Sequence, residues 1–482
     1  MTRGLAGLSL IALALVAGAP GPVGAQSQAV AHLANAREAY RAGRFAEALD
    51  LSRQASAASP ESVEALVAHG AMAEFMGEFD EAQRMADQAL RLAPRNVGVL
   101  YRGASLAVRL GDYDRALTLL DRIIDEHPRV ARAVFTHGPT AVQTGLLRGY
   151  PTLERLARTD PGWFGTAVRA LPAALRTGLL DEYPFLGFIV ELRIDILMEK
   201  GDLDGARRLA LGYGVVQAGR DYCREVSTEP SNEGRFQLFR LAVLAQPQNA
   251  DCIWWYGQWL TDEGFVRLGR IMVIEGTRLT PAPGNKESGA RYLQIRLSGG
   301  REIDKRVEQL ALIGRQRFLR DGDAPGAQRL LEEAVGRDPA FARSYDHLAR
   351  LAWERGDREG AVSWLERGVA ADGRSWRTRR NLGKALDALA RYPEAERHLR
   401  RTVELFPDDA GGHLALARVL YALGRYDEYA RETRGTLAFA RQRSDELAPV
   451  ETFLAGFEQR GPSGGLLPPS PDPRLFIGWN LD

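Results

Sequence analysis

The chain has 482 residues, 45% of them hydrophobic and 26% charged, a composition typical of a soluble globular protein. Its formal net charge of +1 gives no overall attraction to nucleic acid or to an anionic membrane surface, so we expect no nucleic-acid partner. Basic charge is nearly all arginine, which indicates either a genome composition bias or selection for guanidinium chemistry.

Residues 1–25 have the features of a secretory signal peptide. Arg3 precedes an apolar run from Leu5 to about Ala17, too short to span a bilayer, and Val23-Gly24-Ala25 supplies small residues for cleavage. We expect cleavage after Ala25 and an exported protein, periplasmic or secreted. An uncleaved anchor is the alternative, and no membrane span is expected after cleavage.

The stretch 29–130 repeats glycine, alanine and proline, each at a fixed interval of 34 residues. Each glycine predicts a turn, because it adopts a backbone conformation that side chains resist. Each alanine predicts close approach of two helices, and each proline, which has no amide donor, predicts the end of the second helix. The recurring positions are Gly43, Gly77 and Gly111, then Ala48, Ala82 and Ala116, then Pro60, Pro94 and Pro128.

These positions, within the segments YRAGRFAEAL, EFMGEFDEAQ and VRLGDYDRAL, resemble the tetratricopeptide repeat, a helix-turn-helix unit of the same period. The resemblance implies an all-α fold, a superhelical solenoid of antiparallel helix pairs, because one pair cannot bury its apolar faces alone. It also implies a scaffold whose concave surface binds a protein or peptide partner.

Between 131 and 300 the repeat signal weakens. Gly145 keeps the phase and Gly201 begins a turn-like segment, GDLDGA, but five prolines between Pro139 and Pro184 interrupt the pattern. We interpret the region as degenerate repeats, with a helical insertion as the alternative.

One clear repeat returns at 250–283. The resemblance places Trp254 and Trp255 there at positions that line the concave surface, where they would suit a binding hot spot or a sugar-stacking platform. The alternative is that both pack between helices. Cys223 and Cys252 are the two cysteines of the chain, and export would place them in an oxidising compartment. They are a candidate disulfide, with two buried thiols as the alternative.

A second strong block of four repeats runs over 308–441. Gly322, Gly356 and Gly424 keep the interval of the first block, and Ala390 fills the missing place. The family frame implies a basic concave face, which favours an acidic peptide or an anionic polysaccharide. The alternative is a solvated face ion-paired through Asp346, Glu354 and Asp387. The candidate residues of that face are Arg343, His347, Arg350, Arg377, Arg380, Asn381, Lys384 and Arg418.

The C-terminal part begins with an expected capping helix at 442–460, which would close the last apolar face of the array. A tail rich in proline and glycine follows at 461–482, and it ends in the apolar segment LFIGWNLD. Either this tail is disordered, or it folds back into the groove or adds to a partner.

No motif for catalysis, phosphate binding or metal ligation occurs, so we expect no enzyme, no cofactor and no metal. An unrecognised site near His137 or Asp221–Glu225 is the enzymatic alternative. The sequence predicts an exported scaffold or adaptor in envelope assembly or secretion. The other hypothesis is a periplasmic component of polysaccharide synthesis or export that binds an anionic glycan.

Overall fold

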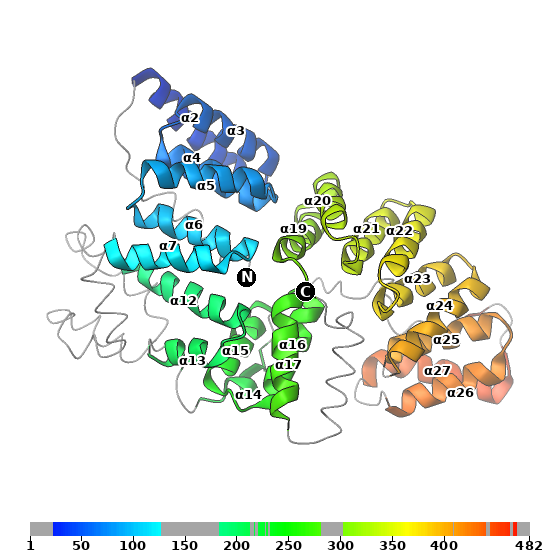
Figure 1. Cartoon of the computed structure of the whole chain (residues 1–482). Coiled ribbons are helices and arrows are strands. Elements are labelled where there is room, and N and C mark those ends of the chain that lie inside the picture. The colour runs from blue at the N-terminus through cyan, green and yellow to red at the C-terminus, as the bar shows by residue number, and fades with distance from the viewer. Residues whose placement is uncertain are drawn as a thin grey trace. The chain divides into compact units, whose positions relative to one another are not determined.

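A computed structural model of the chain contains 21 helices and no strand in the part that it describes. That part comprises residues 23–126, 183–212, 216, 220–226, 228–229, 232–280, 302–407, 409–439, 444–462 and 466–469. The helices pack in consecutive pairs (Figure 1), so the prediction of an all-α solenoid of antiparallel helix pairs is confirmed. Two compact units form: Met1–Thr261 with Arg267–Thr280, and Asp262–Val266 with Pro281–Asp482.

The first unit begins with three helix pairs that we call the first block. Its helices are α2 (Val23–Arg41), α3 (Phe45–Ala58), α4 (Val63–Met76), α5 (Phe79–Leu92), α6 (Val97–Leu110) and α7 (Tyr113–Glu126). The unit continues with α12 (Tyr183–Glu199), α13 (Leu203–Gly212), α14 (Tyr222–Val226), α15 (Asn232–Ala245), α16 (Ala250–Glu263) and α17 (Val266–Leu279).

The second unit contains four helix pairs that we call the second block, followed by a final helix. Its helices are α19 (Lys305–Asp321), α20 (Ala324–Arg337), α21 (Ala342–Glu354), α22 (Arg358–Ala371), α23 (Trp376–Ala388), α24 (Tyr392–Leu405), α25 (Ala410–Ala422), α26 (Tyr426–Phe439) and α27 (Ser444–Arg460). The first helices of successive pairs, α19, α21, α23 and α25, also contact one another. This packing places the first helices on the inner side of the array.

The predicted turn positions end the first helices in both blocks. At Gly77 the backbone is left-handed, with φ 80°, and the next amide, of Glu78, donates to the carbonyl of Ala73 at 2.8 Å. This pattern satisfies carbonyl groups at the helix end and favours glycine. Ala390 adopts the same geometry with φ 56°, and the amide of Arg391 donates to the carbonyl of Leu386 at 2.9 Å.

The predicted small positions lie where two helices of a pair meet. Ala48, Ala82 and Ala116 are at most 1% exposed, and so are Ala327, Ala361 and Ala395. In the pair α16–α17, glycine takes this role at Gly269, where an added Cβ would lie 2.4 Å from Thr261 Oγ1. Such close helix approach leaves no room for a larger side chain.

The pair that stacks on α6–α7 is α12–α13. Ile189, Leu192 and Ile196 of α12 join the same apolar cluster as Leu100 and Leu120. Tyr113 Oη also donates to Glu199 Oε2 at 3.0 Å, and Lys200 pairs with Asp114 at 3.1 Å. The next stacked repeat therefore begins at Tyr183. Gly145 and the prolines from Pro139 to Pro172 lie outside the described residues.

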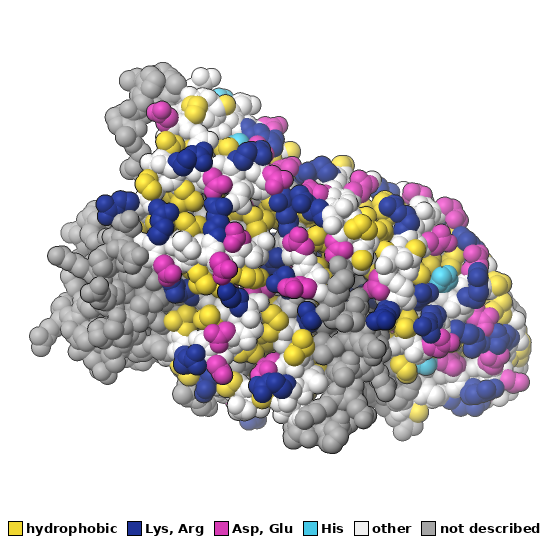
Figure 2. Space-filling model, in the orientation of Figure 1, with side chains coloured by type: hydrophobic (Ala, Val, Ile, Leu, Met, Phe, Trp, Pro, Cys, Tyr) yellow, Lys and Arg dark blue, Asp and Glu magenta, His cyan; other side chains and the backbone are white. Residues whose placement is uncertain are grey.

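Arginine side chains link neighbouring repeats. Arg53 reaches Glu81 at 2.6 Å, Arg102 reaches Glu74 at 2.8 Å and Arg400 reaches Glu428 at 3.0 Å, in each case across 28 residues. Cations and carboxylates are accordingly interspersed on the face shown in Figure 2. The guanidinium fork suits such bridges because it makes two parallel hydrogen bonds to a carboxylate.

Among the described helices, none combines the length and the apolar character that a transmembrane helix requires. The predicted signal peptide lies largely outside the described residues. Ala25 falls in the first turn of α2.

Candidate functional site

The inner surface of the second block, formed by α19, α21, α23 and α25, is the candidate site, and we call it the first-helix face. These four helices contain twelve Lys or Arg against five Asp or Glu, a balance of +7. The second helices of the same pairs contain nine against ten, a balance of −1. Positive charge is thus concentrated on the inner helices of the second block.

Asp346 and Asn381 join α21 to α23 within this face. Asn381 is fully buried and donates from Nδ2 to Asp346 Oδ1 at 3.2 Å, while Thr378 Oγ1 donates to the other carboxylate oxygen at 3.1 Å. Burial raises the pKa of Asp346 to about 6, although hydrogen bonds from Asn381 and the charge of Arg377 oppose the rise. Asn381, predicted to contact a partner, therefore holds two inner helices together.

His347 is 5% exposed and lies among cations. Burial first, and then the charges of Arg315, Arg343 and Arg377, hold its pKa well below 6.5. The imidazole is therefore neutral at pH 7 and adds no charge to the face. A neutral ring among guanidinium groups avoids further repulsion.

Arg380 forms a buried ion pair with the next repeat. Its Nη1 lies 2.7 Å from Asp409 Oδ1, and the two side chains are 9% and 7% exposed. Lys384, on the following turn of α23, is 7% exposed. The two residues were predicted to contact a partner, and the structure gives Arg380 a role in joining α23 to α25.

Arg343 and Arg377 are half-buried, and they are the most direct candidates for contact with a partner. The guanidinium of Arg377 lies 5.7 Å from the centre of the Trp376 ring. Arg350 pairs with Glu354 on the next turn of α21, and Arg418 Nε donates to Asp387 Oδ2 at 2.8 Å. Burial raises the pKa of Asp387, and the cations Arg418 and Lys384 oppose this.

The two tryptophans predicted for the first unit have different surroundings. Trp255 of α16 is 54% exposed. Trp254 faces Gly276 of α17 so closely that a Cβ added to this glycine would lie 2.8 Å from the Cβ of Trp254. Phe236 and Phe239 pack against the buried Tyr256 and also against Trp259. Trp255 is therefore the one of the pair that is accessible for stacking.

Cys223 of α14 and Cys252 of α16 are joined in the structure, with Cα atoms 6.0 Å apart. Cys252 is 1% exposed. The bond fixes the short helix α14 to the repeat that contains the tryptophans. A helix of five residues gains little stability from its own hydrogen bonds, so this connection helps to hold it.

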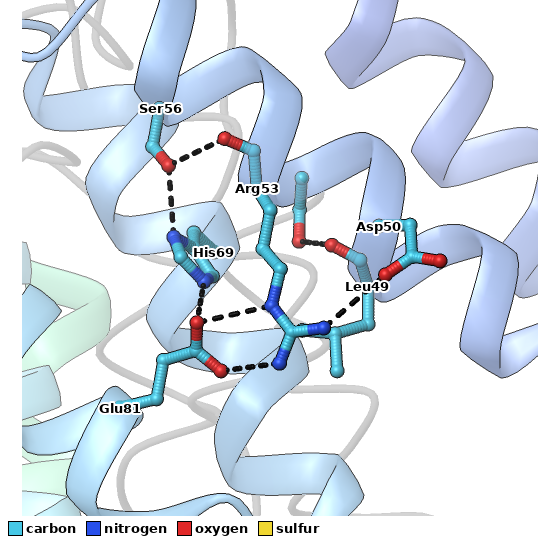
Figure 3. Close-up of polar contacts among 7 residues, drawn as sticks. Leu49, Asp50, Arg53, Ser56, His69 and Glu81 are labelled. Carbon is cyan, nitrogen blue, oxygen red and sulfur yellow. Dashed lines mark hydrogen bonds and ion pairs between the residues drawn. The ribbon is translucent and has the colours of Figure 1, made fainter.

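A polar network in the first block was not predicted from the sequence. Figure 3 shows His69 of α4 between Ser56 of α3 and Glu81 of α5, with Nδ1 2.8 Å from Ser56 Oγ and Nε2 2.9 Å from Glu81 Oε1. Arg53 makes two hydrogen bonds to the same carboxylate. Ser56 and His69 are buried, so the network joins three helices of two repeats. No sequence motif marks it, because its members meet only when the repeats stack.

His137 and Asp221–Glu225 are the residues that the sequence suggests as an enzymatic alternative. His137 lies outside the described residues, and Glu225 forms an ion pair with Arg220 at 2.8 Å. Asp221 accepts hydrogen bonds from the amide of Arg224 and the side chain of Gln246. Within the described ranges, no three His, Cys, Asp or Glu side chains gather in a way that would hold a metal ion.

Stacked antiparallel helix pairs, with left-handed turns and small residues at fixed intervals, define a helical repeat solenoid. The tetratricopeptide repeat pattern matches residues 29–54, 76–134, 316–375 and 380–432. The chain belongs to the tetratricopeptide repeat family. A scaffold for protein–protein interaction is the function that this membership supports.

Solved structures similar to this chain include two large helical repeat proteins. Yeast Tom70 is 14% identical with a TM-score of 0.33, and the match covers 90% of this chain and 96% of that one. The P58(IPK) TPR domain is 13% identical with a TM-score of 0.24, covering 90% and 99%. MamA is 18% identical with a TM-score of 0.26, covering 34% and 98%. Comparison with curated protein sequences found no match.

Proposed function

We propose that this protein is an exported scaffold that binds an acidic, extended segment of a protein partner along its first-helix face. The charge difference between the two sides of the second block is the observation on which the proposal rests: +7 on the first helices and −1 on the second. A preformed cationic surface attracts carboxylates and binds them without much ordering of its own side chains.

Arg343 and Arg377 are the anchors that we propose for the carboxylates of the partner. Each is half-buried on an inner helix, so its side chain is partly desolvated in the folded protein while the residue stays partly accessible. Arginine offers five donors in a fixed plane and binds carboxylates through two parallel hydrogen bonds. The buried Asp346, which accepts hydrogen bonds from Asn381 and Thr378, helps to hold together the two helices that contain these arginines.

The test uses a defined acidic probe, a labelled decapeptide of alternating Glu and Gly, with fluorescence anisotropy as the readout. Changing Arg343 and Arg377 together to Glu should weaken binding by at least about tenfold, since two favourable charge contacts become repulsive. Affinity for the unaltered protein should fall as NaCl is raised, because salt screens exposed charges.

The matched control is Arg401→Glu with Arg434→Glu. It makes the same change of charge on two second helices, where both side chains are more than half exposed. This control should keep its affinity within about twofold. An equal loss of affinity in both double variants would show that net charge, and not the position of the arginines, determines binding. No loss of affinity in either variant would contradict the proposed site.

Export is part of the proposal and rests on the N-terminal sequence and on the paired cysteines. Signal peptides have the charged start, short apolar run and small-residue cleavage site found in 1–25. Disulfides persist in oxidising compartments. Non-reducing mass spectrometry of the native protein should show a mature N-terminus at Gln26 and a bond between Cys223 and Cys252. Two alkylatable thiols or an intact Met1 would count against export.

Within this proposal, the scaffold would act in envelope assembly or secretion. A second candidate is a component of polysaccharide synthesis or export, favoured by the exposed ring of Trp255 on a first helix. Quenching of Trp255 fluorescence by an anionic oligosaccharide, absent in Trp255→Ala, would support the second candidate. Unchanged fluorescence together with binding of the acidic peptide would support the first.

A further inference from the structure

A short segment of the C-terminal tail lies against the second block. The last helix, α27, ends at Arg460, and residues 466–469, Leu-Leu-Pro-Pro, lie beyond it without regular structure. Pro468 is buried, and Leu467 packs on the apolar cluster of the second block. Leu466 is 67% exposed. Two adjacent residues of the segment, Leu467 and Pro468, thus contact the second block, while Leu466 faces solvent.

Arg418 of α25 makes the polar contact with this segment. Its Nη1 donates to the carbonyl oxygen of Pro468 at 2.6 Å, while its Nε donates to Asp387 Oδ2 at 2.8 Å. Asp387 lies on α23, the preceding first helix, and its side chain is 12% exposed. The carboxylate therefore holds the guanidinium in the orientation that leaves one arm for the tail carbonyl.

The chemistry of the segment matches this contact. Proline has no amide donor, so the backbone of a proline pair offers acceptors, and arginine offers donors alone. Each proline fixes its own φ, and the residue before a proline is restricted to extended conformations. Leu467 and Pro468 each precede a proline, so the segment loses little conformational freedom when it binds.

The equivalent position in the first block has different partners. Glu74 and Asp387 both stand three residues before the turn residue of their helix, Gly77 and Ala390. Glu74 accepts from two arginines of the next first helix, Arg102 at 2.8 Å and Arg109 at 3.1 Å. Asp387 shares Arg418 with the backbone of the tail. In the first block the carboxylate is therefore bound by two arginines of the repeat helices. In the second block the corresponding contact includes the backbone of the tail.

We propose that Arg418, positioned by Asp387, forms a binding site for an extended leucine-proline-proline segment, and that residues 466–469 of the chain occupy it. The inference rests on the proposed function, since it makes the tail an internal competitor on the surface that binds a partner. A partner segment that enters this end of the first-helix face must displace the tail. The tail therefore limits binding to partners that outcompete it.

The test is whether the site binds the tail when the tail is supplied separately. A chain ending at Pro462 retains every helix of the second unit, and the probe is a labelled peptide of residues 463–472, SGGLLPPSPD. The truncated chain should bind the probe at least about tenfold more tightly than the full chain does, because a tethered segment competes at an effective concentration on the order of 1 mM.

Two substitutions make the result specific. In the truncated chain, Arg418→Ala should abolish binding, whereas Arg401→Ala, which removes an exposed arginine of α24, should leave it unchanged. In the full-length chain, Leu467→Asp with Pro468→Gly should open the site and restore binding of the probe. This second variant keeps the whole chain, so it answers the question even where truncation disturbs folding.

Three outcomes would overturn the proposal. They are equal affinity of the full and opened chains for the probe, binding that Arg418→Ala leaves intact, and absence of binding by both the truncated and the substituted chain. The acidic peptide and its anchors Arg343 and Arg377 give an independent readout. If that peptide binds while the tail probe does not, the tail inference fails and the proposed function stands.

Discussion

The two blocks share one repeat frame but treat charge differently. In the first block the first helices α2, α4 and α6 contain four Lys or Arg against three Asp or Glu, a balance of +1. The four first helices of the second block reach +7. The fold needs glycine, alanine and apolar residues at set positions and tolerates many charges elsewhere. The surplus in the second block is therefore a feature that the repeat fold itself does not require.

Local pairing explains how the first block stays near neutral. Glu74 accepts from Arg102 and Arg109 of the next repeat, and Glu81 accepts from Arg53 and His69. Hydrogen bonds from Arg53 are the main cause that lowers the pKa of Glu81, and the positive partners add to this. Carboxylates held by two partners from neighbouring helices are structural. The comparison leads us to expect that charge changes in the first block alter stability. In the second block we expect changes at the half-buried Arg343 and Arg377 to alter binding, and changes at a buried ion pair such as Arg380 with Asp409 to alter stability.

The largest expected effect tests this comparison at a buried ion pair of the second block, Arg380 with Asp409. Arg380→Ala in the second block should lower the free energy of unfolding by about 3 kcal/mol, because Asp409 would remain buried without its cation. Urea unfolding followed by circular dichroism measures this. The double variant Arg380→Ala with Asp409→Ala should recover part of the loss, and a single variant within about 0.5 kcal/mol of the parent would contradict the structural role.

The second prediction compares equivalent positions of the two blocks. Glu74→Gln should lower the free energy of unfolding by about 2 kcal/mol, because two arginines lose their carboxylate. Asp387→Asn should cost about 1 kcal/mol, since it removes one partner and relieves a carboxylate whose burial is unfavourable. Equal costs measured by urea unfolding would argue that the two sites are built alike.

The third prediction concerns pH and the neighbours Asp346 and His347. A histidine whose folded pKa lies below 6.5 makes the protein less stable as pH falls through 6.5, because the unfolded chain takes up the proton. Asp346 acts in the opposite direction: its folded pKa of about 6 exceeds 3.8, so stability rises as pH falls from about 6 towards 3.8.

Single variants separate these opposing effects. Asp346→Asn should leave the histidine effect, so its stability relative to the parent should decline on acidification, and His347→Gln should show the reverse. Each slope is at most about 1.4 kcal/mol per pH unit, the value for one proton. Urea unfolding at a series of pH values between 4 and 7 gives the slopes. Parallel curves for parent and variants would show that neither group is perturbed as described.

The smallest expected effect concerns Ala390, which in the described part of the chain is the left-handed turn residue that is not glycine. Ala390 has φ 56°, and a residue with a side chain is strained there. Ala390→Gly should raise the free energy of unfolding by about 1 kcal/mol, and Gly424→Ala, at φ 73° in the next turn, should lower it by a similar amount. Thermal and urea unfolding check both, and a destabilised Ala390→Gly variant would contradict the strain.

The sequence by itself determined the repeat architecture. A fixed period in turn glycines and small alanines is a local code, since each repeat folds by nearly the same contacts as its neighbours. Gly77, Gly111 and Gly322 therefore end helices where the period placed them. The basic character of the second block was also readable, because the frame assigns each position to an inner or an outer helix.

Tertiary structure alone decided what the charged residues do. Asn381 and Arg380 hold neighbouring helices because Asp346 and Asp409 come within reach only when the repeats stack. The direct stacking of α12–α13 on α6–α7 and the contact between Arg418 and Pro468 likewise join residues far apart in the chain. The repeat period predicts which residues of neighbouring helices meet. It does not predict which charged side chains are buried or paired across longer separations, because this depends on how the repeats pack.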